Sequence, residues 1–138
     1  MISDELKAII ESLRSREGMR FLEAATEEQI TGFEKEEGIQ LPGKYKEWLL
    51  FSDGGEFYLP GGLQIYGVAH KPIIDVSDDD KPGDQYTVIG ALSFGDPILC
   101  EKGSETISIY NHEAGRIESD ETYADFFCFL RDLPGIIG

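Results

Sequence analysis

The sequence has few of the groups that cross-link a chain or direct it to a membrane. Its 2 cysteines, Cys100 and Cys128, are too few for a disulfide framework and match no metal-ligand spacing. The first 13 residues include three acidic side chains, so they lack the apolar run of a signal peptide, and no stretch of about 18 apolar residues occurs anywhere. These absences predict a cytoplasmic protein.

Positive charge is also scarce. Only 12 Lys and Arg face 27 Asp and Glu, which gives a net charge of −15. Nucleic-acid phosphates and anionic lipid surfaces would repel such a chain, because binding to either needs Lys or Arg. We therefore expect no direct contact with DNA, RNA or a membrane. The acidity can serve solubility alone, or it can serve to attract a basic partner.

Catalytic motifs are missing as well. The sequence contains no Gly-x-Ser-x-Gly turn, no His-Glu-x-x-His pair and no phosphate-binding glycine loop with its lysine. The two histidines, His70 and His112, fall in expected loops, and Cys100 falls in an expected strand, where a buried thiol is the ordinary interpretation. The sequence thus predicts a non-enzymatic protein without a cofactor or catalytic residues. A pocket that held a histidine beside carboxylates would instead indicate an enzyme or a small-ligand binder.

What the chain does contain is the composition of a folded domain, with 41% hydrophobic and 11% aromatic residues over 138 positions. This length and composition predict a single domain over residues 1–138. Apolar residues at helical spacing predict a first helix that includes residues 6–13. Thr26 and Gln29 form a capping-box pattern for a second helix, which Gly38 would end, and a third helix is expected to begin near Pro42.

The apolar period changes to two after residue 55, which is typical of strands. We expect strands at residues 56–59, 63–66, 86–92, 98–101, 106–110 and 116–118, and a loop over 68–85. A last helix should follow, capped by Asp120, with an apolar face that runs from Tyr123 to Leu133. This order predicts an α+β fold: N-terminal helices, then a mainly antiparallel five- or six-stranded sheet, then a C-terminal helix packed on the sheet.

Acidic side chains concentrate in the second part of the chain. Residues 1–52 carry 7 basic and 11 acidic side chains, whereas residues 53–138 carry 5 and 16. The densest run lies in the expected 68–85 loop. Such like charges repel one another, and a basic partner would offset that repulsion and be attracted to it. We therefore predict partner-binding residues in this order, with the last two of second rank: Asp78, Asp79, Asp80, Asp84, Asp75 and Glu56.

Two further interpretations concern the same region. The acidic loop resembles a calcium loop only in part, because Pro82 and Ile89 occupy ligand positions, so we expect no metal and a solvated loop instead. Several aromatic residues accompany the acids in the expected strands, and any two that remain exposed would mark a binding face. They are Phe57, Tyr58, Tyr66, Tyr86 and Tyr110.

One stretch carries a more specific motif than composition does, at the positions Ile30, Phe33, Glu34, Gly38, Ile39, Leu41, Pro42, Tyr45, Lys46, Leu49, Leu50, Asp53, Gly54 and Gly55. This stretch is similar to a known family, the SUKH superfamily in its Smi/Knr-like branch. Asp53 stands where the family most often has Asn. Weaker similarity occurs at Tyr66-Gly67 and from Tyr123 to Leu130, so the resemblance spans roughly residues 26 to 133.

This resemblance implies a helix-flanked sheet and a binding role without a catalytic motif. Bacterial members of the family are mostly immunity proteins that neutralise toxins, many of them nucleases or deaminases, and fungal members act as partner-binding modules. The expected partner is therefore a cognate toxin or another basic protein, bound through the acidic surface. A general scaffold or regulatory domain with some other protein partner is the alternative.

Overall fold

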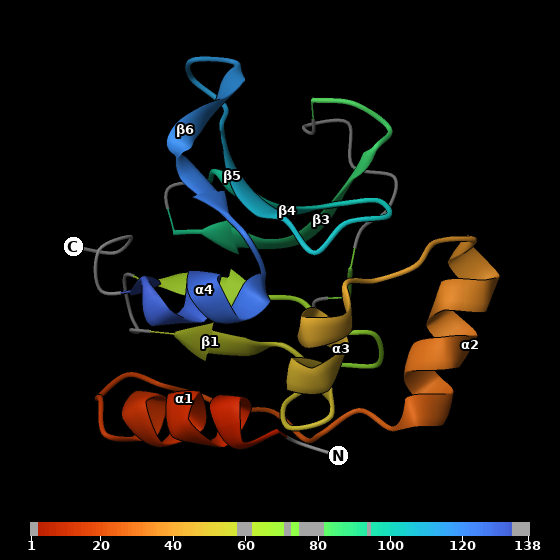
Figure 1. Cartoon of the computed structure of the whole chain (residues 1–138), viewed down its shortest axis with the longest axis vertical. Coiled ribbons are helices and arrows are strands. Elements are labelled where there is room, and N and C mark those ends of the chain that lie inside the picture. The colour runs from red at the N-terminus through yellow and green to blue at the C-terminus, as the bar shows by residue number, and fades with distance from the viewer. Residues whose placement is uncertain (1–2, 58–61, 71–72, 75–81, 94, 134–138) are drawn as a thin grey trace.

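A computed structural model describes residues 3–57, 62–70, 73–74, 82–93 and 95–133, without the side chains of residues 118–120. In the described residues, three helices come first, six strands follow and one helix closes the order (Figure 1). The elements are α1 (Asp4–Arg14), α2 (Glu27–Glu37), α3 (Gly43–Leu49), β1 (Gly55–Phe57), β2 (Leu63–Ile65), β3 (Tyr86–Leu92), β4 (Pro97–Glu101), β5 (Ile107–Asn111), β6 (Arg116–Tyr123) and α4 (Phe126–Arg131). This arrangement confirms the predicted α+β fold.

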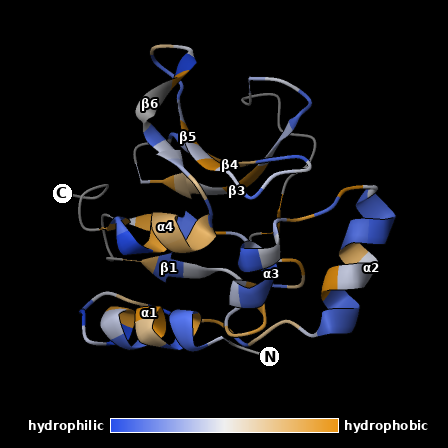
Figure 2. Cartoon of the chain, in the orientation of Figure 1, coloured by the Kyte–Doolittle hydropathy of each residue, from blue (hydrophilic) through white to orange (hydrophobic). Residues whose placement is uncertain are grey.

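Local signals define α2 at both ends. The Thr26 hydroxyl accepts a hydrogen bond from the Gln29 backbone N–H, and the Gln29 side chain accepts one from the Thr26 N–H, which completes the predicted capping box. Gly38 ends the helix with φ of 67°, a left-handed conformation that costs glycine little. Only Ile30 is buried along this helix, and Figure 2 shows α2 as mostly hydrophilic. Capping therefore defines both ends of α2.

The start of α3 depends on a distant residue. Pro42 occupies the N-cap and makes no side-chain cap. Glu105, from the turn between β4 and β5, instead accepts hydrogen bonds from the backbone N–H groups of Gly43 at 2.7 Å and Lys44 at 3.0 Å. These N–H groups belong to the first turn and have no partner inside the helix. The carboxylate therefore caps α3 and joins it to the sheet.

The six strands form one antiparallel sheet in the order β1-β2-β3-β4-β5-β6. One face carries the main core, in which the fully buried Trp48 of α3 contacts Phe57 of β1 and Phe126 of α4. The Trp48 indole N–H donates to the Gly54 carbonyl at 3.0 Å, so its single polar atom is satisfied. In Figure 1, strands β3–β6 curve away from the helices. No helix of the described residues is long and apolar enough to cross a membrane.

The predicted boundary of the last helix was wrong. Strand β6 continues to Tyr123, where Thr122 and Tyr123 pair with Ser108 and Ile107 of β5. The N-cap of α4 is Asp125, whose carboxylate accepts from the Cys128 N–H at 2.8 Å, and not Asp120. Both aspartates precede an apolar run and suit an N-cap. Pairing with β5 keeps residues 116–123 extended and so excludes the earlier start.

Candidate functional site

The structure places two of the six predicted partner-binding residues. Asp84 is exposed and lies two residues before β3, and Glu56 is the central residue of β1. Asp75, Asp78, Asp79 and Asp80 lie outside the described residues. Because residues 75–84 lead directly into β3, the predicted acidic segment joins the sheet at Tyr86.

Strand register defines this face, which we call the outer face because it points away from the helices. One row across it pairs Glu56 with Gln64 and Gln64 with Ala91. A second row pairs Val88 with Leu99, Leu99 with Ser108 and Ser108 with Thr122. The other members, by pairing and alternation, are Tyr86, Glu101, Tyr110 and Ile117. The outer face therefore crosses the whole sheet, from Glu56 on β1 to Thr122 on β6.

A small apolar centre lies on the outer face. Val88 and Leu99 are 2% and 0% exposed, yet neither belongs to the core that packs against the helices. Their neighbours Ile98 and Cys100 do belong to that core, as the alternation of a strand requires. Burial on both faces of β3 and β4 explains their nearly continuous apolar sequence.

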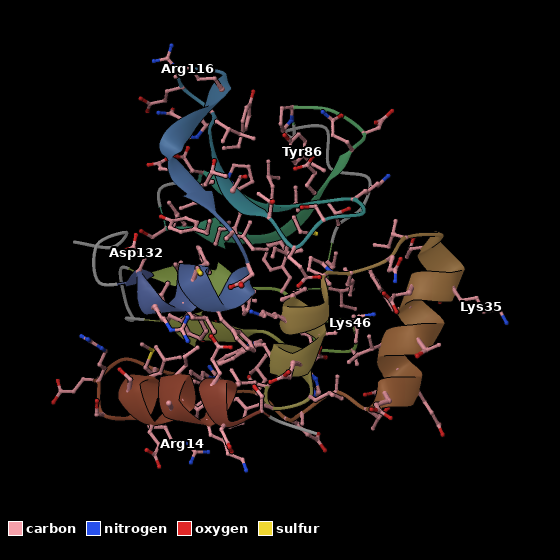
Figure 3. The ribbon with its side chains drawn as sticks, viewed as in Figure 1. Arg14, Lys35, Lys46, Tyr86, Arg116 and Asp132 are labelled. Carbon is pink, nitrogen blue, oxygen red and sulfur yellow. The ribbon has the colours of Figure 1, made fainter. Side chains whose placement is uncertain are left out.

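The candidate aromatics separate into two groups. Phe57 is fully buried in the main core, and Tyr66 is half-buried and packs against that core. Tyr86 and Tyr110 are half-buried on the outer face, at its two sides, and Figure 3 shows Tyr86 on the concave side of the curved strands. Tyr58 lies outside the described residues. Among the described candidates none is fully exposed, so the expectation of two exposed aromatics is not met.

A hollow of about 310 Å³ lies at the β1–β3 end of the outer face, lined by residues that include Glu56, Gln64, Ala91 and Ser93. The Gln64 side-chain amide donates to Glu56 Oε1 at 3.3 Å. Arg20 Nη1 lies 3.6 Å from Glu56 Oε2, and the Arg20 side chain is 69% exposed. A long and exposed ion pair of this kind contributes little to stability. Glu56 therefore presents a carboxylate in the hollow that only weak contacts hold.

Buried carboxylates elsewhere pair with both histidines. Asp53, whose side chain is fully buried, accepts hydrogen bonds from the backbone N–H groups of Val68, Ala69 and His70 at 2.7–2.8 Å. The His70 ring donates from Nδ1 to the same carboxylate at 2.8 Å, since a carboxylate can only accept. This bond raises the pKa of His70, against a smaller opposing effect of desolvation, and Glu23 raises it further. Asp53 thus fixes residues 67–70 to the α3–β1 turn.

Asp96 has the same role at the other end of the sheet. It is 7% exposed and accepts from the backbone N–H of His112 and from its ring Nδ1. This pair joins the β3–β4 turn to the β5–β6 turn. Sequence reasoning identified both histidines but missed both carboxylate partners. The position of Asp53 beside two turn glycines was the available signal for one of them.

The remaining reactive groups also have structural surroundings. Burial raises the pKa of the Cys100 thiol to about 12, so this side chain stays protonated at neutral pH. Within the described part of the chain, no three His, Cys, Asp or Glu side chains gather in a way that could hold a metal ion. Asp53 and Asp96 accept hydrogen bonds from loop residues and so hold those loops in place.

Comparison with known proteins agrees with this description. No curated protein matches the chain. Residues 24–132 match the SMI1 / KNR4 family (SUKH-1), a span that begins before α2 and ends after α4. Because this match covers well over half of the sequence, the chain belongs to the SMI1 / KNR4 (SUKH-1) family.

Proposed function

We propose that this chain is a non-catalytic immunity protein that binds a basic toxin through its acidic surface and so neutralises it. SUKH-1 is a family of immunity and regulatory proteins, and its domains are generally non-catalytic. The observation that carries the proposal is the family match together with a net charge of −15. A toxin that acts on nucleic acid is itself basic around its substrate site, so an acidic protein is complementary to it.

The proposed contact is electrostatic in its first stage. Asp75, Asp78, Asp79, Asp80 and Asp84 precede β3, and Glu56 lies on the same sheet. Attraction between opposite surface charges raises association rates above the range of about 10⁵–10⁶ M⁻¹s⁻¹ that is typical without steering. Because salt screens exposed charges over about 10 Å at 0.1 M, the effect should fall with ionic strength.

A charge-reversal experiment tests the proposal. The immunity role predicts that an adjacent gene encodes the toxin. The triple variant D78K/D79K/D80K should slow association with that toxin domain by about 10- to 100-fold at low salt. The matched control is E28K/E36K/E37K on α2, where all three side chains are exposed. It changes the net charge equally but at a different surface, so we expect less than about a threefold effect.

Stopped-flow or surface-plasmon measurements at two salt concentrations separate the outcomes. Equal slowing by both triple variants would mean that only net charge matters. The absence of a complex with the neighbouring toxin domain, together with no rescue of growth in cells that express it, would refute the immunity role. Folding of every variant is checked by circular dichroism.

A further inference from the structure

Ile73 is the one large apolar side chain that lies exposed in the described part of the chain, with an exposed fraction of 39%. Its neighbour Ile74 is 5% exposed and belongs to the main core. Isolated apolar side chains are common on protein surfaces, so exposure alone assigns no role to Ile73. What distinguishes this residue is how firmly the surrounding backbone is held.

Two contacts fix the backbone at Ile73. Gly67 and Ile73 form a parallel bridge, and the Ile74 N–H donates to the Gly67 carbonyl at 2.9 Å. Because successive side chains of an extended segment point to opposite sides, the burial of Ile74 directs Ile73 outward. A β-branched side chain also has few rotamers. Ile73 is therefore ordered before any partner arrives, and an ordered anchor loses little conformational entropy on binding.

The adjoining residues 67–70 are held as firmly. The buried Asp53 carboxylate accepts hydrogen bonds from three backbone N–H groups of this segment and from the His70 ring. Ala69 is exposed, so the segment adds apolar surface to that of Ile73. We call residues 67–70 and Ile73 together the Ile73 platform. It is a rigid surface whose apolar side chains solvent can reach.

Charged groups border the Ile73 platform. The Glu23 side chain is 85% exposed, and its Oε2 lies 3.6 Å from His70 Nε2. The buried Asp53 carboxylate, 2.8 Å from His70 Nδ1, offsets the positive charge that His70 gains on protonation, so the local charge stays negative. In the sequence, residues 71–84 continue from the platform with 5 Asp and 2 Lys. An apolar anchor within a charged border is the arrangement of protein binding sites.

We propose that the Ile73 platform is the docking surface for a protein partner that offers an apolar pocket bordered by arginine or lysine. Ile73 enters that pocket, and the partner's cation pairs with Glu23. Charge complementarity selects this occupant, because a second copy of the chain would carry the same net charge of −15 and be repelled. The inference rests on the proposed function and names the place of contact and the chemistry of the partner.

Substitution of Ile73 separates an apolar anchor from simple charge attraction. Ile73→Asp removes the apolar contact but adds a negative charge, which a basic partner attracts. Association with the toxin domain should therefore stay within about threefold of the wild type, whereas dissociation should become at least about tenfold faster. The control is Thr31→Asp, which makes the same change of charge at an exposed position of α2 and should alter neither rate by more than about threefold.

Two further variants refine this test. Ile73→Val removes a single methylene group and should weaken binding by less than about fivefold. Glu23→Lys should slow association at least about threefold, because it repels the partner's cation, whereas Glu37→Lys at the other end of α2 should not. Surface-plasmon measurements give both rates, and thermal unfolding checks the fold. Equal dissociation rates for Ile73→Asp and Thr31→Asp would overturn the proposal.

Mapping by nuclear magnetic resonance tests the wild-type surface without the toxin. The probe is a short peptide of alternating arginine and phenylalanine residues, added to the isotope-labelled protein at low ionic strength. The largest shifts should occur at the Ile73 methyl groups and at the amides of residues 67–70. The same peptide with glutamate in place of arginine is the control and should leave the spectrum unchanged. Shifts that concentrate on another surface, or no binding of the arginine peptide, would overturn the docking surface.

The remaining outcomes distinguish this inference from its rivals. A wild-type dimer in analytical ultracentrifugation that Ile73→Asp converts to monomer would assign the Ile73 platform to a second copy and refute the proposal. A toxin complex that Ile73→Asp leaves unchanged would refute the docking surface and leave the immunity role intact. Absence of that complex, while the arginine peptide still maps to the Ile73 platform, would refute the immunity role alone.

Discussion

The contact between Asp53 and His70 should be the most sensitive electrostatic feature of this fold. Asp53 is fully buried and accepts three backbone hydrogen bonds and one from the His70 ring, all at 2.7–2.8 Å. Replacement by alanine leaves these four donors without their acceptor. Each buried donor left unsatisfied costs about 1–3 kcal/mol, and water can reach some of them here. We therefore expect Asp53→Ala to lower the free energy of unfolding by about 3–5 kcal/mol.

Substitution of His70 should cost much less. Its side chain is 34% exposed, so solvent screens the charge and can replace part of the lost bond. His70→Asn replaces a ring donor that can be charged with a neutral amide donor and so weakens the hydrogen bond to Asp53, and we expect a loss of about 1 kcal/mol or less. Asp53→Ala should lower the free energy of unfolding several times more than His70→Asn does. The reason is that the histidine variant keeps the backbone hydrogen bonds to Asp53.

The pH dependence has a definite sign. The hydrogen bond to Asp53 raises the pKa of His70 above its ordinary value of 6.5. A raised pKa in the folded state means that protonation favours folding. This contribution is therefore complete below pH 6.5 and is lost as the pH rises through the raised pKa of folded His70. His70→Asn should remove this part of the pH dependence.

Urea unfolding at closely spaced pH values, together with nuclear magnetic resonance titration of the His70 ring, measures both effects. In Asp53→Asn the His70 pKa should fall, because the carboxylate that raises it is gone. If the His70 pKa in this variant equals that of the wild type, or if Asp53→Ala is no less stable than His70→Asn, the assigned role of Asp53 is incorrect.

Two further predictions follow from close contacts in the same half of the molecule and between the helices. Gly67→Ala should destabilise the fold by more than about 2 kcal/mol in thermal unfolding, because a Cβ at this position would collide with the Asp53 carboxylate and its backbone carbonyl. Lys44→Met should make the fold less resistant to acid. In the wild type, burial acts to raise the Asp125 pKa, but hydrogen bonds from Lys44 and Cys128 outweigh this effect and hold that pKa low. The stability that Asp125 contributes is present above its ordinary pKa of 3.8 and is lost as the pH falls, so acid unfolding of the variant should begin at higher pH.

Local signals in the sequence were enough to predict most elements. Thr26, Gln29 and Gly38 define α2 because capping depends on residues within one turn. The bounds of β3 were predicted correctly, because its residues form one mostly apolar run with turn residues on either side. The start of α4 was mispredicted because Asp120 and Asp125 are equivalent as caps, and only pairing with β5 distinguishes them.

The candidate site was less accessible to sequence reasoning. Tyr86 and Tyr110 were recognised among five aromatics, but their separation from Phe57 and Tyr66 depends on the register of strands far apart in the chain. The bond from His70 to Asp53 joins residues 17 positions apart, and no periodic pattern encodes it. Side-chain chemistry is visible in a sequence, whereas the face on which a side chain lies depends on the whole sheet.

The distribution of carboxylates explains how one small domain can be both acidic and ordered. Asp53 and Asp96 are buried, whereas Glu105 is exposed, but each of the three accepts backbone hydrogen bonds and holds a turn or a helix end. Glu56 and Asp84 bear the same group in partly or fully exposed positions on or beside the sheet. The first set is required for the fold, so its replacement should lower stability. The second set is not required for it, so its replacement should change association with a basic partner while leaving stability nearly unaltered. Measuring both quantities for both sets therefore separates the charges that build this domain from those that it offers to a partner.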